Sequence, residues 1–212
     1  MKRPSLTLPP SEPVLLHACC APCSSAILEW MVAHDIRPTI FYYNPNIYPE
    51  DEYIKRRDES QRQAEALGLQ WVEGAYDHGE WLEAVKGLES EPERGGRCLR
   101  CFMMRLRAAS EAAKEMGCGC VTTTLASSRW KSQSQIDTAG EWAEGETGVT
   151  FWHQNWRKDG LSERRAALLR ENGFYNQLYC GCEFSMQNGG LKEKEKDSLD
   201  KRDDEGNECN IC

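Results

Sequence analysis

Short apolar runs rich in β-branched and aromatic residues alternate along the chain with longer stretches in which apolar residues recur every three or four positions. The short runs predict strands at 14–17, 39–43, 70–72, 120–124 and 149–152. The periodic stretches predict helices at 24–34, 50–67, 99–116, 132–142 and 162–171. Strands that alternate with helices form a parallel sheet covered by helices, so we expect a single α/β domain.

The two ends of the chain differ from this pattern. Residues 191–212 include eight acidic and five basic residues but almost no apolar ones, and such a segment cannot bury enough surface to offset the entropy of ordering it. Residues 1–13 contain four prolines. We therefore expect an N-terminal extension over 1–13, the folded domain over 14–190 and a disordered acidic tail over 191–212.

Composition and charge exclude several classes of protein. The chain of 212 residues is 40% hydrophobic and 28% charged, which is ordinary for a globular protein. No apolar run approaches the roughly 18 residues of a membrane-spanning helix, and residues 1–13 contain no apolar core of a signal peptide, so we expect a cytoplasmic protein with no membrane contact. The net charge of -8 does not favour a nucleic-acid partner, although a local basic surface is compatible with one.

Cysteine is the one anomalous residue type, with eleven in the chain. Because the cytosol keeps thiols reduced, so many cysteines indicate metal, cluster or redox chemistry. Three groups stand at predicted element boundaries. The first follows the first strand, the second opens a strongly periodic helix and the third follows the last helix: Cys19, Cys20 and Cys23; Cys98 and Cys101; Cys180 and Cys182.

Each of these groups alone is a modest signal, since a lone CxxC is about half the time only a structural zinc half-site or an inert pair. Together they supply seven thiols, more than the four that one tetrahedral zinc ion or one iron–sulfur cluster takes. This count favours a four-cysteine cluster plus a second metal or a redox-active pair. Cys118 and Cys120 flank a predicted strand and are expected to be small core residues. Cys209 and Cys212 form a further CxxC in the tail, for which we expect at most transient reactivity.

Five motifs resemble the QueH-type, cobalamin-independent epoxyqueuosine reductases. They are HACCAPCSS at 17–25, FYYNPNIYPEDEYIKR at 41–56, GGRCLRCFMMRL at 95–106, TTTLASSRWKS at 122–132 and FYNQLYCGCEFS at 174–185. They follow the order of the family and span about 170 of the 212 residues. The resemblance implies a HUP-like, Rossmann-like fold and reduction of the epoxide of epoxyqueuosine, at the wobble position of tRNA, to the alkene of queuosine.

The resemblance also implies a cofactor set, a [4Fe–4S] cluster beside an additional mononuclear iron. The fold is related to that of the PP-loop ATPases, but Cys19, Cys20 and Cys23 stand where those enzymes have their phosphate-binding loop, so use of ATP is not expected. Some relatives have an aspartate in place of Cys23. The ligand set of the second metal is therefore open, because a thiolate is a softer ligand than a carboxylate.

Side-chain roles follow as expectations. Removing the epoxide oxygen needs two electrons and two protons, and the candidate proton donors are Tyr43, Asp137 and Lys131. Aromatic rings, amides and arginines can stack on an extruded base or contact phosphate and ribose. The candidate substrate-binding residues are Asn44, Asn46, Tyr48, Tyr53, Arg56, Arg97, Arg100 and Arg129. Six arginines are expected to form a local basic rim: Arg56, Arg57, Arg97, Arg100, Arg105 and Arg107.

Two other classes of function remain as alternatives. One is a PP-loop-like tRNA thiolation enzyme, which needs a glycine-rich phosphate loop after the first strand. The other is a non-catalytic, metal-stabilised RNA-binding scaffold. For the reductase, the expected partners are a tRNA with a queuosine-type anticodon and an external electron donor of the ferredoxin or flavodoxin type.

Overall fold

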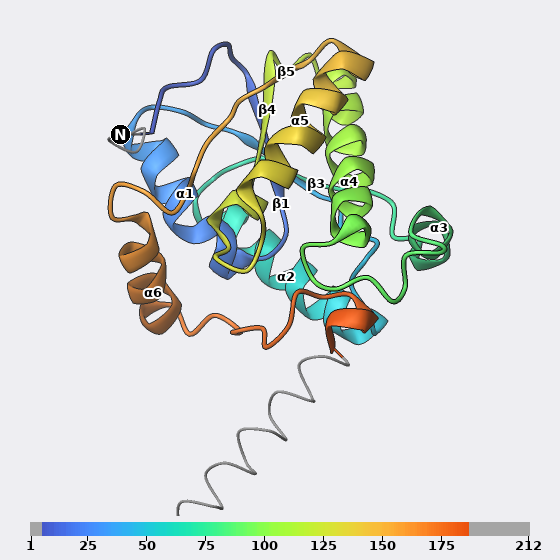
Figure 1. Ribbon diagram of the computed structural model, residues 1–212. Coiled ribbons are helices and arrows are strands. Elements are labelled where there is room, and N and C mark those ends of the chain that lie inside the picture. The colour runs from blue at the N-terminus through green and yellow to red at the C-terminus, as the bar shows by residue number, and fades with distance from the viewer. Residues whose placement is uncertain (1–5, 187–212) are drawn as a thin grey trace, which may run out of the picture.

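The computed structural model describes residues 6–186, which form a five-stranded sheet between layers of helices (Figure 1). The strands are β1 (Val14–Ala18), β2 (Thr39–Tyr42), β3 (Trp71–Glu73), β4 (Cys120–Thr123) and β5 (Thr150–Phe151). Their order in the sheet is β3-β2-β1-β4-β5, and all neighbours pair in parallel. This is the Rossmann-like order in which the chain crosses from one half of the sheet to the other beside β1, so the predicted fold class is confirmed.

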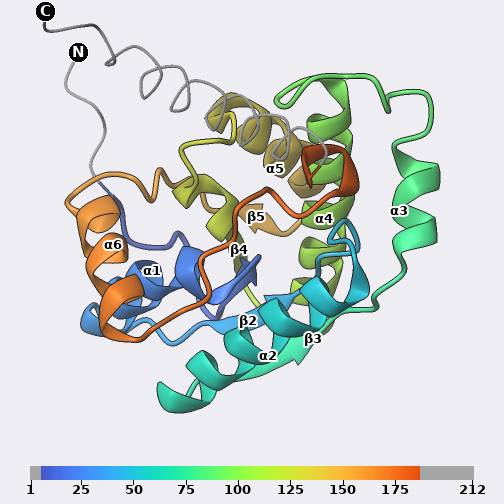
Figure 2. The same ribbon diagram turned by 90° about the horizontal axis from the view of Figure 1, so that it is seen from below.

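Helices cover both faces of the sheet (Figure 2). The helices are α1 (Ala21–Ala33), α2 (Glu50–Ala66), α3 (His78–Ala84), α4 (Gly96–Glu115), α5 (Gln133–Thr147) and α6 (Leu161–Glu171), with a 3-10 turn η1 (Thr124–Ser127). One layer contains α1, α2 and α6, and the other contains α4 and α5. The apolar stripes of α1 and α4 are buried, with Ile27 and Met31 on α1 and Phe102 and Leu106 on α4. The stripes therefore hold the two helix layers to the sheet.

The five predicted strands and five predicted helices are present with boundaries shifted by a few residues. Helix α3 was not predicted, because seven residues are too few to show a helical period. The sequence does mark the start of α3, because Asp77 is a favourable N-cap residue. Its carboxylate accepts the Glu80 backbone N–H at 2.9 Å.

One glycine allows an unusually close contact between the layers. A Cβ on Gly140 of α5 would lie 2.2 Å from the ring of Phe151 on β5. The residue must therefore be glycine for α5 to pack directly on the edge strand.

The part of the predicted N-terminal extension that the structure describes packs on the domain. The Leu6 N–H donates to Asp159 at 2.9 Å, and Gln154 Nε2 donates to the Thr7 carbonyl oxygen at 2.7 Å. The predicted tail over 191–212, with Cys209 and Cys212, lies outside the described residues. Within 6–186, no helix is both long and apolar enough to cross a membrane.

Candidate metal centre and substrate cavity

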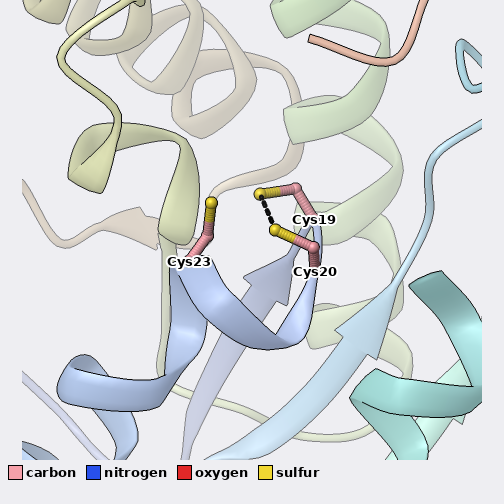
Figure 3. Close-up of side chains that lie close together, drawn as sticks. All are labelled: Cys19, Cys20 and Cys23. Carbon is pink, nitrogen blue, oxygen red and sulfur yellow. Dashed lines mark hydrogen bonds between the residues drawn. The ribbon is translucent and has the colours of Figure 1, made fainter. Parts of the chain in front are cut away.

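The first cysteine group lies at the carboxyl end of β1, where the chain turns into α1. Figure 3 shows the side chains of Cys19, Cys20 and Cys23 pointing toward one another. The three Sγ atoms lie within 4.8 Å of one another, and those of Cys19 and Cys20 are 3.7 Å apart. Thiolates on one tetrahedral zinc-sized ion are separated by about 3.8 Å, the distance that follows from a metal–sulfur bond of about 2.3 Å. These cysteines are therefore spaced to hold a metal ion.

Cys19 is the thiol of this group that most favours the anion. Hydrogen bonds from Cys20 and Cys23 and the positive charges of Lys131 and Arg105 hold its pKa well below the usual value, against the effect of burial. The hydroxyl of Thr124 on η1 contributes twice, because it accepts the Cys19 N–H at 3.0 Å and donates to Cys19 Sγ at 3.3 Å. One thiolate beside two protonated thiols is thus prepared before any metal arrives.

His17, two residues earlier on β1, cross-links the central strands instead of joining the thiols. It is fully buried, and burial lowers its pKa to about 3, so the ring is neutral. Nε2 lies 3.1 Å from the Tyr43 carbonyl oxygen, which can only accept, and Nδ1 lies 2.8 Å from the Thr123 hydroxyl. Nε2 therefore carries the proton, and Nδ1 accepts from Thr123.

A cavity of about 670 Å³ opens over these thiols at the carboxyl end of the sheet. Six of the seven candidate cysteines line it, from three separate segments of the chain: Cys19, Cys20, Cys23, Cys98, Cys180 and Cys182. The seventh, Cys101, is buried behind the wall in a small apolar cluster with Cys182, Trp81 and Val85. The predicted convergence of the three groups is thus observed around one cavity.

The second and third cysteine groups are more widely spaced than the first. Among the described residues, only the first group has three ligand atoms within 4.8 Å. Burial, with repulsion from Cys180 as a smaller cause, raises the pKa of Cys98 to about 11 and that of Cys182 to about 12. Cys101 shifts in the same direction, mainly through burial. Cys98, Cys101 and Cys182 therefore hold their protons more tightly than free thiols do, and binding a metal must displace those protons.

The shape of the third group depends on one glycine. Gly181 has a φ of +124°, and a Cβ there would lie 3.0 Å from Ile47 Cγ1 and 3.1 Å from Arg56 Nη1. The Gly181 carbonyl oxygen accepts the Tyr48 N–H at 2.8 Å. The segment carrying Cys180 and Cys182 is therefore held tightly against the loop that follows β2.

The walls of the cavity are strongly cationic. Eight basic residues line it: Arg56, Arg94, Arg97, Arg105, Arg129, Lys131, Arg157 and Arg165. Within the described chain, Glu93 is the only acidic residue among the lining residues, and it accepts the Ser185 hydroxyl at 2.6 Å. Burial lowers the pKa of Lys131, but electrostatic attraction to the sulfurs of Cys180, Cys19 and Cys23 outweighs it and the net pKa is raised, so this ammonium stays charged. An acidic chain thus presents a basic cavity to an anionic substrate.

Six of the eleven predicted catalytic and substrate-binding residues line this cavity: Lys131, Asn44, Asn46, Arg56, Arg97 and Arg129. Two of these arginines are largely engaged in the fold. Arg56 pairs with Glu52 at 2.6 Å, and Arg97 donates to backbone carbonyl oxygens of the loop before α4, among them that of Glu89 at 2.7 Å. Arg129, by contrast, is exposed, and its guanidinium lies 4.7 Å from the centroid of the Trp130 ring.

The other five predicted residues do not line the cavity. Tyr43 stacks on Phe41 in the core, and Tyr53 stacks on Tyr76 and donates to Glu73 at 2.8 Å. The remaining three lie on other surfaces: Tyr48, Asp137 and Arg100.

Tyr48 and Asp137 have partners in the fold. Tyr48 stacks on His78, with ring centroids 5.2 Å apart. The Asp137 carboxylate accepts Gln133 Nε2 at 3.0 Å and lies 3.3 Å from His153 Nδ1. Arg100 is exposed on α4. Their roles in binding or catalysis therefore stay predictions that the cavity lining does not support.

The expected arginine rim is half present. Arg56, Arg97 and Arg105 line the cavity, whereas Arg57 pairs with Asp58 at 2.7 Å and Arg107 with Glu111 at 2.9 Å. Arg105 is 2% exposed, as Arg97 is, and donates to the Asn44 side-chain carbonyl. Its position four residues after Cys101 on one helix face is the sequence signal for this role.

Many further lining residues were missed, among them Glu93, Arg94, Trp130, Gln135, Arg157 and Arg165. They come from loops and helices outside the cysteine groups, and Arg165 is on α6, far from any motif. No spacing in the sequence distinguishes them, because the turn that brings α6 to the cavity is a tertiary feature.

The fold and the site together define a Rossmann-like α/β protein with a thiol-rich, cationic cavity, in which one cysteine group is spaced to bind a metal ion. The sequence model of the family described as epoxyqueuosine reductase QueH matches residues 14–188. The chain belongs to this family, and it is an oxidoreductase of queuosine biosynthesis that converts epoxyqueuosine to queuosine in tRNA.

Relatives named epoxyqueuosine reductase QueH are similar over most of their length. The chain is 44% identical to the protein of Histophilus somni over 187 residues, which are 87% of this chain and 77% of that protein. It is 42% identical to the protein of Haemophilus influenzae, with 91% and 80% covered. It is 36% identical to that of Thermotoga maritima, with 86% and 93% covered. Family membership decides against the thiolation enzyme and the non-catalytic scaffold.

Proposed function

We propose that the cavity binds the epoxyqueuosine nucleotide at the wobble position of a tRNA with a queuosine-type anticodon and reduces its epoxide at a metal centre held by the seven cysteines. One observation carries this proposal: six thiols from three distant segments and eight cations line a single cavity. The thiols suit redox-active iron, and the cations suit a polyanionic substrate.

The reaction is a deoxygenation. Both C–O bonds of the epoxide break, a C=C bond forms, and the oxygen leaves as water after taking up two electrons and two protons. The cavity needs a source of single electrons, a cation near the departing oxygen and a route for protons. When bound, a cluster and an iron ion supply the electrons and a Lewis acid.

We assign the two metal sites by spacing. Cys19, Cys20 and Cys23 are close enough to share the additional mononuclear iron. Cys98, Cys101, Cys180 and Cys182 are the ligands left for the [4Fe–4S] cluster, which separates its ligand sulfurs further than a single ion does because they lie beyond the corners of a cube. The wider spacing of these four thiols supports that assignment.

Lys131 is the candidate group for the departing oxygen. It lines the cavity and stays charged beside the thiolates. An ammonium there neutralises negative charge as it develops on the oxygen and carries a transferable proton. Tyr43 and Asp137 lie outside the cavity walls, so they are weaker candidates for a proton donor.

Asn46 is the candidate for recognising the sugar-like ring of the substrate. Its side chain is 2% exposed and lines the cavity, and within the described residues its Oδ1 has no hydrogen-bond partner. A buried acceptor without a partner carries a free-energy cost that a substrate hydroxyl or amine relieves. We therefore assign it a hydrogen bond from the substrate.

Electrons must come from outside the chain, and a carrier of the ferredoxin or flavodoxin type meets the need for single electrons at low potential. The nine cysteines of the described chain are all free thiols. Thiols that serve as metal ligands must stay reduced, so we place the reaction in the cytoplasm, where thiols are kept reduced.

The decisive experiment is anaerobic incubation of the iron-reconstituted protein with a reductant and epoxyqueuosine-containing tRNA, followed by mass analysis of the nucleosides. We expect loss of one oxygen atom from the modified base. We also expect iron and sulfide in the protein, with more iron than one cluster holds. A protein that binds only zinc, or that leaves the nucleoside unchanged under these conditions, contradicts the proposal.

The assignment of sites has its own test. Cys98→Ala is expected to remove the visible absorbance of the cluster, whereas Cys23→Ala is expected to lower the iron content and leave most of that absorbance. Cys118→Ala, at a core position, serves as the matched control. Equal loss of absorbance in Cys98→Ala and Cys23→Ala contradicts the division into two sites.

A further inference from the structure

A large aromatic side chain is exposed at the edge of the cavity. Trp130 lines the cavity, and 61% of its surface is exposed. Tryptophan side chains in folded proteins are on average largely buried, so this exposure is unusual. Arg129 lies over its ring, with 4.7 Å between the guanidinium carbon and the ring centroid.

The loop that carries Trp130 is held in place by Arg94, which lies just before α4, and by Gln135 of α5. Arg94 donates from Nε to the Trp130 carbonyl oxygen and from Nη2 to that of Arg129, both at 2.9 Å. Gln135, on α5, donates to the Arg94 carbonyl oxygen at 2.8 Å and thereby fixes the backbone of this arginine. The indole is therefore exposed to solvent while hydrogen bonds fix the backbone of its loop. Its position is set before any ligand binds.

The surroundings of the ring are cationic. Arg94, Arg129 and Arg157 line the same cavity, and Arg129 and Arg94 are exposed. An exposed aromatic ring among arginines is the combination that binds single-stranded nucleic acid, in which bases stack on the ring and cations contact phosphates.

We propose that Trp130 stacks on a nucleotide next to the wobble nucleotide and holds the anticodon loop open while the wobble base occupies the cavity. This inference rests on the proposed function, because a base that enters the cavity leaves the stack of the loop. Its neighbour then loses a stacking partner, and the indole at the cavity edge replaces it. Trp130 is accordingly a positioning residue, since it touches a base other than the one that reacts.

The test is a binding titration with the full, metal-loaded chain and an anticodon stem–loop RNA. Two RNAs carry the fluorescent base 2-aminopurine, one on the 5′ side and one on the 3′ side of the wobble position. Trp130→Ala and Trp130→Leu are expected to weaken the Kd by about 5- to 150-fold, the factor equivalent to one base stacked on an aromatic ring. Trp130→Phe is expected to stay close to the wild-type Kd.

The probe adds a direct signature of stacking. Fluorescence of 2-aminopurine is expected to be quenched on binding at one of the two positions in the wild type and in Trp130→Phe, and to remain unquenched in Trp130→Ala and Trp130→Leu. Met116→Ala, at an exposed apolar residue beyond the end of α4, is the matched control and is expected to behave as the wild type. Absorbance of the metal centre reports whether each variant is folded and loaded.

Three outcomes overturn the inference. A Kd unchanged in Trp130→Ala shows that the ring does not contact the RNA. A wild-type Kd in Trp130→Leu shows that apolar cover is enough and stacking is absent. An unchanged Kd for RNA with a raised KM for the electron-carrier protein assigns the surface to that protein instead.

Failure of this inference differs from failure of the proposed function. If the wild-type protein binds the stem–loop but never reduces epoxyqueuosine, the proposed function fails while the stacking result stands. If Trp130→Ala binds and reduces the tRNA as the wild type does, only the stacking inference fails.

Discussion

Two groups of buried cysteines lie at opposite ends of the same sheet, on neighbouring strands. Cys19 and Cys20 follow β1 at its carboxyl end, and Cys118 and Cys120 stand at the amino end of β4. All four are at most 9% exposed. Burial alone therefore does not distinguish the group at the metal centre from the group in the core.

The neighbouring charges differ between the two ends. The pKa of Cys19 is lowered by the thiols beside it and by Lys131 and Arg105. Cys118 and Cys120 have pKa values raised by burial, and Cys120 donates its thiol hydrogen to the Ser11 carbonyl oxygen at 3.0 Å. The carboxyl end of a parallel sheet collects helix N-termini and loop cations, so a cysteine is a candidate metal ligand there and a packed core residue at the other end.

The largest expected effect comes from removing one thiol at each end. Cys19→Ala should lower turnover by more than about 100-fold and reduce the iron content, because the variant loses a ligand and the thiolate that prepares the site. Cys120→Ala should keep the turnover and the iron content of the wild type. Turnover and iron analysis of the two variants check this, and equal losses would remove the distinction between the two ends.

A second comparison uses one lysine at each end. Lys131→Met removes the cavity ammonium and should lower turnover by about 100-fold, the loss expected for one preorganised electrostatic contact. Lys114→Met removes an ammonium that donates to the Thr147 carbonyl oxygen at 3.1 Å, near the amino end, and should leave turnover unchanged. Single-turnover rates under reducing conditions separate them, and Lys131→Arg should recover part of the loss if positive charge is what matters.

A smaller effect is expected from exposed arginines. Arg129→Gln should raise the KM for tRNA several-fold and reduce the salt slope of binding by about 0.7, the value for one contact to single-stranded phosphate. Arg37→Gln, at the amino end before β2, should change neither. Titrations at several salt concentrations test this, and an unchanged slope in Arg129→Gln means that its guanidinium does not contact phosphate.

The smallest effect concerns stability at the amino end. Cys118→Ala deletes one buried sulfur and should lower the free energy of unfolding by about 1 kcal/mol, without changing turnover. Denaturant titration of the metal-free protein measures this. A drop in iron content in this variant would mean that Cys118 contributes to a metal site after all.

The cysteine motifs were more informative than the other site candidates for a physical reason. A thiol group at a strand–helix junction needs only local spacing to be recognised, and all three groups reach the cavity region as expected. Tyr53 and Asp137 were candidates whose residue types also suit the core and the surface, and both lie outside the cavity lining, where they hydrogen-bond the Glu73 carboxylate and the Gln133 amide. Arg56 belongs to both classes, because it lines the cavity and is also held by Glu52.

The sequence by itself determined the alternation of strands and helices, the cysteines at their junctions and the family, since these depend on periodicity and on motifs that each lie within a few turns of chain. Only the tertiary structure decided which cations face the thiols, because Arg105 of α4 and Arg165 of α6 reach one cavity through the packing of two layers on a sheet. It also decided that Trp130 is exposed on an anchored loop, through hydrogen bonds from Arg94, 36 residues away. Contacts between distant segments depend on how the elements pack, and no local pattern encodes them.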